Sequence, residues 1–579
     1  MALQNGLVFG EDFVFTYGPL GVLTTRLPIG LNIGILVLFD LFVILNICFL
    51  VQKIFVHLKL IEKWLLGALI ILTSDFYKWD IVPLMHFLML CHLILYVKYH
   101  KLWHLVVSSV FGVALFFCKA NFGVVSLGCL VGLLIILVFN KKADRIELLG
   151  IASLIAILTF VSAFFLKVDI ISYLKGNLEL AFGFQEALLL PMDSAIKAVF
   201  IVFISLLILS LPVILIIQFR NQSKPFYKLV NPINGAFLLI FTISIYVIYK
   251  QSIVRFDGAH YPTIIRFFVP FALLVLYSFF KIDKIAKQYL ASISILVSLA
   301  FADMTGFRPL RDTFDQLVST KEYYKTLFSE PIEEDVSTYP VSESIKESIG
   351  DNSIDIVPTE ISLAFVNGWN YRGRPVIQSY SGYTEYLDNL NADFFLEPDA
   401  PNLILYSDST IEKRYPFFDE PQTKLNLLLH YKPIDADSNY VLLKKQDKPL
   451  KFNLKAESKI NLALNEFYPL EDSKGLIFAD FKINYNLFGW FRKLIYQPPT
   501  LNITFYLEDG QKKTHRLVKG ATYLLLINKY ISGIRGSSEL FMNPFDLPSN
   551  VIGIKIHSEF TSHFSPLIDM RVQNVIREF

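Results

Sequence analysis

Charged residues are scarce in this chain of 579 residues, at 18% of the total, whereas hydrophobic residues make up 54%. A water-soluble protein of this length carries more charge and less apolar content, so the composition excludes a wholly soluble protein. The formal net charge is only +2, and no cluster of basic residues is interleaved with aromatic ones. Nucleic acid is therefore not expected as a partner.

Cysteine is also rare, and its four positions all lie in or at the ends of apolar runs: Cys48, Cys91, Cys118 and Cys129. The second half of the chain has none, which excludes a disulfide framework and a cysteine-based zinc site there. The N-terminal residues lack a basic region followed at once by an apolar run, so no cleavable signal peptide is predicted.

Long apolar runs are abundant, but they are confined to residues 31–303. A run of about 20 apolar residues is long enough to cross a bilayer. The sequence predicts ten such spans, at 31–52, 60–74, 82–98, 103–118, 122–140, 147–166, 194–217, 233–250, 262–280 and 285–303. We therefore expect a loop at 1–30, a polytopic α-helical membrane domain at 31–303 and a soluble remainder.

The orientation follows from lysine and arginine, which favour the cytoplasmic side of a membrane. Alternate loops are rich in them, for example the loop with Lys141, Lys142 and Arg145, and the loops between are poorer. This alternation places residues 1–30 and 304–579 outside the cytoplasm. Because an external N-terminal segment has no obvious translocation signal, we expect a further helix to precede it in the natural protein.

Polar chemistry gathers in the loops predicted to be external. The opening loop contains "GEDFVFTYGPLG" (10–21), with the adjacent carboxylates Glu11 and Asp12. The loop at 250–262 places Arg255, Asp257 and His260 within six residues; a structural turn closed by an Arg–Asp pair is the alternative reading. The segment 167–193 has apolar residues at helical spacing, which predicts a helix lying on the membrane surface.

Two further charged residues lie at the spans themselves. Lys119, where a span meets the outer surface, would either bind a phosphate or extend its ammonium group to water. Asp40 lies near the middle of the first span, where a charge costs roughly 2.5–3.5 kcal/mol on insertion, so we expect a hydrogen bond to a neighbouring helix. His86 and His92 are expected to be packed or hydrogen-bonded rather than metal ligands.

The segment 304–447 is predicted to hold a small α/β domain. Strand-like runs ("SIDIVP" at 353–358, "RPVIQSY" at 374–380 and "NLILYS" at 402–407) alternate with helical ones, which favours a largely parallel sheet. A glycine-rich phosphate loop and a G-x-S-x-G motif are both missing, so a nucleotide-binding or hydrolase function lacks support.

The segment 448–579 consists of short strand-like runs separated by turn residues, such as "LNITFYLEDG" and "VIGIKIHSEF". This pattern predicts an antiparallel, jelly-roll-like β-sandwich. Such modules often bind glycans through exposed aromatic residues, for which Trp490, Tyr496 and Tyr506 are candidates. Packing in the core is the alternative for each of them.

Three stretches, "FTYGPLG", "VRFDGAH" and "RPVIQSYSGYTEYLDNLNADFF", resemble uncharacterised bacterial membrane proteins of this general shape. A polytopic domain with an acidic first external loop and an external C-terminal domain also resembles the GT-C class of membrane glycosyltransferases. That resemblance implies sugar transfer from a polyprenyl-phosphate donor to an envelope glycan or glycoconjugate, on the outer face of the bacterial inner (plasma) membrane. It also implies a catalytic carboxylate in the first external loop, which is Asp12 here, with Glu11 as the second choice.

The same resemblance implies a substrate-binding role for residues beside that loop and in the later external loops: Arg255, Asp257, His260, Lys119 and Tyr17. Their cationic members would stabilise the leaving lipid phosphate. No cofactor is required, although a divalent metal is compatible with the chemistry. The main alternative is a non-catalytic membrane protein for polysaccharide assembly or export. A transporter ranks third, because we find no internal repeat and few charges at mid-membrane beyond Asp40.

Overall fold

A computed structural model describes most of the chain, namely residues 5–26, 33–56, 81–191, 232–257, 340–471 and 475–578, with residues 2, 59–60, 63–64, 260, 315 and 319–325. The chain divides into two compact units. The first comprises Met1–Gly6, Thr16–Val168 and Leu190–Pro331. The second comprises Leu7–Phe15, Asp169–Leu189 and Ile332–Phe579. Two early segments thus belong with the C-terminal half.

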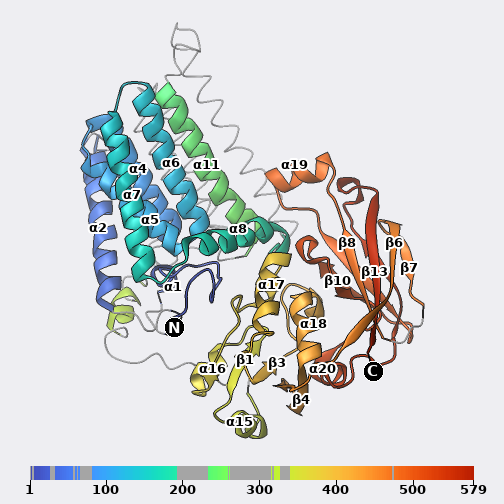
Figure 1. Ribbon diagram of the computed structural model, residues 1–579. Coiled ribbons are helices and arrows are strands. Elements are labelled where there is room, and N and C mark those ends of the chain that lie inside the picture. Colours follow the sequence, from blue (N-terminus) through green and yellow to red (C-terminus); the bar gives the residue numbers. More distant parts are fainter. Residues whose placement is uncertain are drawn as a thin grey trace. The chain divides into compact units, whose positions relative to one another are not determined.

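The first unit is helical (Figure 1). Its helices are α1 (Val22–Thr25), α2 (Ile33–Phe55), α4 (Ile81–Tyr99), α5 (Trp103–Cys118), α6 (Ala120–Phe139), α7 (Arg145–Phe165) and α11 (Pro232–Val254). Among the described residues, five helices are long and apolar enough to cross a membrane, namely α2, α4, α6, α7 and α11. The shorter α5 is also apolar. These features are consistent with a membrane protein.

Six of the ten predicted spans coincide with α2, α4, α5, α6, α7 and α11. The predicted spans at 60–74, 194–217, 262–280 and 285–303 lie almost wholly outside the described residues. The total of ten spans and their orientation therefore stay predictions.

Burial differs sharply among these helices. Nearly every residue of α4 between Val82 and Tyr96 is buried, so this helix lies inside the bundle. On α7, in contrast, Ile151 and Ala163 are buried, whereas Phe164 and many other apolar side chains are exposed. An apolar helix with an apolar outer face is what contact with lipid would require.

The second unit begins with an α/β sheet. Its strands are β1 (Ser353–Val357), β2 (Asn370–Tyr371), β3 (Leu403–Tyr406), β4 (Tyr431–Ala436) and β5 (Val441–Lys445), in the order β2-β1-β3-β5-β4. β1 pairs in parallel with β2 and β3, whereas β5 is antiparallel to both β3 and β4. The α/β organisation agrees with the prediction, but the sheet is mixed rather than largely parallel.

Five helices accompany this sheet in the same unit: α8 (Ile170–Ala187), α15 (Glu343–Ile349), α16 (Ser362–Val366), α17 (Glu385–Phe394) and α18 (Pro421–His430). The prediction of a helix within 167–193 is met by α8. Asp169 begins it by accepting the backbone N–H of Ser172 at 2.8 Å.

The prediction of a strand at 374–380 is wrong. This segment has no strand partner and leads into the short 3₁₀ helix η3 (Ser379–Ser381). The reason lies in the side chain of Asn391, which accepts the N–H of Val376 at 2.8 Å and donates to its carbonyl at 2.9 Å. An amide side chain thus takes the place of a neighbouring strand.

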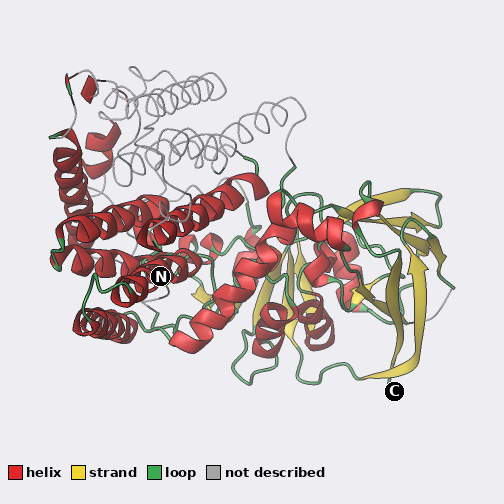
Figure 2. Cartoon of the chain, turned by 90° about the horizontal axis from the view of Figure 1, so that it is seen from above, coloured by secondary structure: helices red, strands yellow, loops and turns green. Residues whose placement is uncertain are grey.

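The C-terminal region is an antiparallel β-sandwich, as predicted, and Figure 2 shows its sheets at the C-terminal end of the chain. One sheet has the order β10-β9-β12-β7 and the other β11-β8-β13-β6, which is the strand order of a jelly roll. The strands are β6 (Phe452–Ala463), β7 (Phe467–Pro469), β8 (Leu476–Lys482), β9 (Leu501–Leu507), β10 (Lys512–Leu517), β11 (Leu525–Leu526), β12 (Val551–His557) and β13 (Leu567–Arg577). Two helices, α19 (Leu487–Ile495) and α20 (Gly533–Met542), complete it.

The α/β sheet and the sandwich share one hydrophobic core. Ile404 of β3 and Leu427 of α18 belong to the same buried cluster as Phe478 of β8 and Phe505 of β9. The predicted boundary at 447/448 therefore marks a change of secondary structure, but not a break in packing.

Candidate functional site

The predicted catalytic acids lie on a tight turn. The N–H of Gly10 donates to Phe13 O at 2.9 Å, and the N–H of Asp12 donates to Val8 O at 2.9 Å. The Asp12 carboxylate accepts the N–H of Val8 through Oδ2 at 2.9 Å, so its side chain closes its own turn. Glu11 and Asp12 are both exposed.

The turn is fixed to the rest of the second unit. Gly10 has a φ of +101°, and a Cβ atom there would lie 2.3 Å from the backbone nitrogen of Tyr173 on α8, so only glycine fits. The N–H of Asp169 donates to Phe9 O at 3.1 Å, and the N–H of Val14 donates to Pro375 O at 2.8 Å. The exposed acids therefore stand on an anchored backbone.

The second part of the opening stretch belongs to the first unit, where it covers the end of α5. The N–H of Gly18 donates to Cys118 O at 3.0 Å, and the N–H of Leu20 donates to Phe117 O at 2.9 Å. These bonds satisfy carbonyl groups that a helix end leaves without a partner. Lys119 follows directly, in an extended conformation between α5 and α6.

Two predicted substrate-binding residues, Lys119 and Tyr17, come together at this junction. The Lys119 ammonium nitrogen lies 5.3 Å from the centroid of the Tyr17 ring and 5.7 Å from that of Phe122. Both distances are within the range of cation–π attraction. The aromatic rings thus hold the ammonium group at the break between two helices.

The three residues predicted from the loop after α11 also come together. Arg255 donates through Nε to Asp257 Oδ2 at 2.7 Å, and His260 Nδ1 lies 2.6 Å from Asp257 Oδ1. The same Oδ1 accepts the backbone N–H of His260 at 3.1 Å. All three side chains are about 27–30% exposed. Asp257 thus lies between the Arg255 guanidinium and the His260 imidazole, so the contacts of the structural-turn alternative are present.

Asp40 on α2 is hydrogen-bonded to neighbouring helical segments, as predicted. Its carboxylate forms a two-point ion pair with Arg26, at 2.7 and 2.5 Å, and accepts the Tyr324 hydroxyl. Tyr324 lies in a helical segment and Arg26 directly follows α1, so the predicted hydrogen bond to a neighbouring helix is present. The positive charge of Arg26, which balances the carboxylate, was not predicted. His86 agrees with the prediction, because its two ring nitrogens lie 2.7 Å from Ser126 Oγ and Ser244 Oγ.

His92 is also hydrogen-bonded, as predicted. Its Nδ1 lies 2.9 Å from Nδ1 of His104, and its Nε2 lies 2.8 Å from Oδ1 of Asn46. The part played by His104 and Asn46 was not predicted, because they come from two other helices.

The aromatic candidates of the sandwich differ in exposure. Trp490 is 58% exposed, so core packing is wrong for this residue. The guanidinium of Arg492 lies 5.2 Å from the Tyr496 ring, and Tyr506 packs edge-on against Phe467 at 4.9 Å. Glycan binding by any of them stays a prediction.

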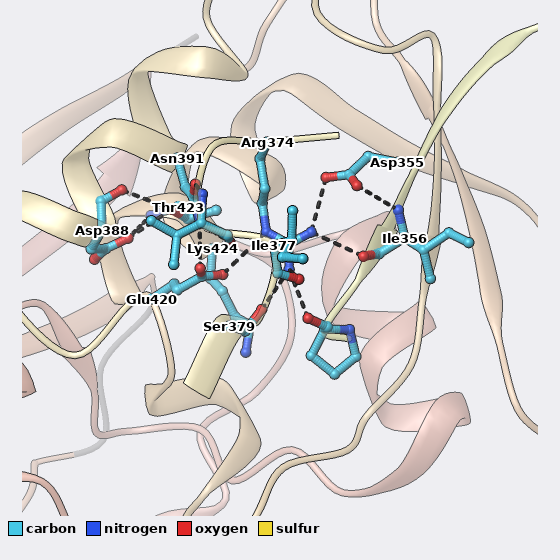
Figure 3. A network of polar contacts seen from close by, with 12 residues as sticks. Asp355, Ile356, Arg374, Ile377, Ser379, Asp388, Asn391, Glu420, Thr423 and Lys424 are labelled. Carbon is cyan, nitrogen blue, oxygen red and sulfur yellow. Dashed lines mark hydrogen bonds and ion pairs between the residues drawn. The ribbon is translucent and has the colours of Figure 1, made fainter. Parts of the chain in front are cut away.

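Sequence reasoning missed a buried polar network centred on Arg374 (Figure 3). The Arg374 guanidinium is fully buried and donates to Asp355 Oδ2 at 2.9 Å and Ser379 Oγ at 3.0 Å. It also donates to the carbonyl groups of Ile356 at 2.9 Å and Pro358 at 2.7 Å. Arg374 thus occupies the carboxyl end of β1, where a ligand would bind in many α/β proteins.

Glu420 lies on the other side of Arg374 in Figure 3 and is fully buried. Its Oε2 is 3.7 Å from Arg374 Nε, and Asn391 donates to its Oε1. Burial raises the pKa of Glu420 to about 7, against the opposing effect of the Arg374 charge.

Asp388 on α17 extends the network to α18. It accepts the backbone N–H groups of Gln422 at 2.8 Å and Thr423 at 2.9 Å, in the first turn of α18. It also accepts the Tyr523 hydroxyl at 2.8 Å. Burial raises the pKa of Asp388. The network is buried and its hydrogen bonds join Arg374 to β1, and α17 to α18.

Within the described part of the chain, no group of three His, Cys, Asp or Glu side chains is arranged to hold a metal ion. No protein-family model matches the chain, and a search of curated proteins found none similar to it. The observations define the class of protein only as one with apolar helices of membrane-spanning length and a large α/β and β-sandwich unit.

Proposed function

We propose that this chain is an integral-membrane glycosyltransferase of the GT-C type. It would transfer a sugar from a polyprenyl-phosphate donor to an envelope glycan or glycoconjugate on the outer face of the bacterial inner membrane. In this proposal the chain spans the membrane ten times, with residues 1–30 and 304–579 outside. The five apolar helices and the large second unit support it.

The observation that carries the proposal is the anchored, exposed turn with Glu11 and Asp12. A general base must be accessible to its substrate and held in a fixed position. Gly10 fixes the turn against α8, and the Val8 N–H orients the Asp12 carboxylate through Oδ2. Asp12 would use Oδ1 to accept the proton.

The chemistry of an inverting transfer assigns a role to each predicted residue. The acceptor hydroxyl oxygen attacks the anomeric carbon while Asp12 takes its proton, and the bond from that carbon to the phosphate oxygen breaks. The lipid phosphate leaves with an additional negative charge, which cationic hydrogen-bond donors stabilise. Arg255, His260 and Lys119 would be those donors. Asp257 would orient the first two, and Tyr17 the third.

The second candidate is a non-catalytic protein that holds glycan during polysaccharide assembly or export. One observation favours it: Asp257 already pairs with Arg255 and His260, which reduces the positive charge available to a phosphate. Asp12 likewise has a structural task in closing its turn.

The test is sugar transfer by the full chain in vesicles, with a labelled polyprenyl-phosphate sugar as donor. Asp12→Asn keeps an oxygen for the Val8 N–H but removes the base, so we expect turnover to fall by about 10²–10⁴-fold. The matched control is Glu11→Gln on the same turn, which should retain turnover. Equal turnover of Asp12→Asn and the unaltered chain would reject Asp12 as the base. Glycan binding by the unaltered chain without any transfer would favour the second candidate.

A further inference from the structure

Helix α19 exposes an unusual amount of apolar surface. Six of its nine residues are large apolar side chains with exposed fractions from 47% to 86%: Leu487, Phe488, Trp490, Phe491, Leu494 and Ile495. Single exposed apolar residues are common on protein surfaces, but a contiguous group of this kind marks an interaction surface.

This apolar face is held outward by specific contacts. Asn486 begins the helix, accepting the N–H of Gly489 at 3.1 Å and donating to Ser562 O at 2.7 Å. Gly489 is buried, and a Cβ atom there would lie 2.1 Å from the carbonyl oxygen of His563. The small residue of α19 thus packs against η6 (Thr561–His563), and the bulky residues project away from the protein.

The charged residues of α19 lie on its inner side. The Arg492 guanidinium is 4.2 Å from the centroid of the Phe560 ring, and Lys493 Nζ is 2.7 Å from Glu186 Oε1. A helix on a water-facing surface has the opposite arrangement, with apolar residues inward and charges outward. The reversal is expected where the medium outside the helix is apolar.

The Lys493–Glu186 ion pair connects α19 to the last turn of α8 within the same unit. α8 has its own exposed apolar stripe, formed by Ile171, Leu178 and Phe182. Its N-cap, Asp169, follows the end of the candidate span α7 by four residues, a length of at most about 14 Å. α8 therefore begins close to a membrane surface, and α19 is tied to it.

We propose that α19 inserts its apolar face into the outer leaflet of the bilayer and anchors the β-sandwich to the lipid surface. The combination of tryptophan, phenylalanine and leucine on the exposed face, with cations behind it, suits the boundary between headgroups and acyl chains. This anchor is independent of the proposed glycosyl transfer, because either candidate function would use it.

The test places an environment-sensitive fluorophore on α19 in the full chain. The native cysteines are replaced, and Phe491→Cys is labelled with a nitrobenzoxadiazole probe and reconstituted in phosphatidylglycerol–phosphatidylethanolamine vesicles. We expect blue-shifted emission and at least twofold quenching by lipids with a spin label near the headgroup. The matched control is Ile552→Cys on β12, also exposed at 48%, which should show neither effect. Equal emission at both sites without quenching, or a blue shift at 491 without lipid quenching, would overturn the proposal.

A second measurement keeps the native cysteines. Brominated lipids quench tryptophan fluorescence on contact, so the full chain and its Trp490→Phe variant are compared in vesicles of brominated and ordinary lipid. We expect the variant to lose a quenchable component of the emission. An identical quenched intensity in the two proteins would show that Trp490 does not reach lipid.

Discussion

The two units bury polar side chains in different ways. In the helical unit, the buried polar groups of α4, α5 and α6 are imidazoles and hydroxyls that bond to one another, to Asn46 of α2 or to helix carbonyl groups. His86 lies between Ser126 and Ser244, for example. In the second unit, full charges are buried, with Arg374 between Asp355 and Glu420.

The difference follows from how each unit satisfies its backbone. The backbone N–H and C=O groups of an apolar helix bond to one another, so few of them need a side chain as hydrogen-bond partner. At the carboxyl end of β1, some carbonyl groups receive no hydrogen bond from a neighbouring strand. The Arg374 guanidinium donates to two of them, the carbonyl groups of Ile356 and Pro358. A buried charge is therefore the consequence of an irregular backbone, and its removal should be far more damaging than the loss of a neutral group.

The largest effect is expected from Arg374→Ala. The substitution leaves Asp355 and Glu420 buried without their cation, which should lower the free energy of unfolding of the second unit by about 3–5 kcal/mol. Denaturant unfolding in detergent measures it. The matched control is Arg372→Ala, whose ion pair with Asp399 is exposed and should contribute less than about 1 kcal/mol. Similar losses for both variants would contradict the comparison.

A smaller effect is expected from Glu420→Gln, which should change how the free energy of unfolding depends on pH. Because burial raises the pKa of Glu420 from 4.5 to about 7, the folded state keeps a proton that the unfolded state releases. The resulting stability is fully present below about pH 4.5 and is lost as the pH rises through about 7. Glu420→Gln should flatten this slope, by roughly 1–3 kcal/mol between pH 5 and 8. Parallel pH profiles of the two proteins would refute the role of Glu420.

The smallest effect is expected in the helical unit, from His86→Leu. Ser126 and Ser244 also donate to carbonyl groups of their own helices, so each hydroxyl keeps a partner after the substitution. The free energy of unfolding should fall by about 1 kcal/mol. Ser109→Ala, which removes a bond within one helix only, provides the control. If His86→Leu lowered the free energy of unfolding by 3 kcal/mol or more, buried neutral groups of the helical unit would contribute as much as the buried charges of the second unit, which contradicts the comparison.

The sequence predicted what depends on neighbours along the chain. Apolar runs located α2, α4, α5, α6, α7 and α11, and the alternation of strand-like runs located β1, β3 and the sandwich. The cluster of Arg255, Asp257 and His260 was predictable for the same reason, since its members lie within six residues.

Features that depend on distant partners escaped prediction. The segment 374–380 has the residue types of a strand, and only the tertiary contact with Asn391 shows otherwise. β4 begins directly after α18 and contains Pro433, so it lacks a strand's usual signals. The pairs Arg26–Asp40 and Arg374–Glu420 depend on side chains that the fold brings together.

The anchoring of the opening turn has a consequence for the biogenesis of the protein. Val14 bonds to Pro375, so the opening segment cannot complete its contacts until residue 375 has been synthesised. At about 5–20 residues per second, translation needs roughly 20–70 s to cover that interval. A nascent chain stalled before residue 375 would hold its acidic turn on α8 through Phe9 and Gly10, but would lack the bond from Val14 that ties the segment to the α/β domain.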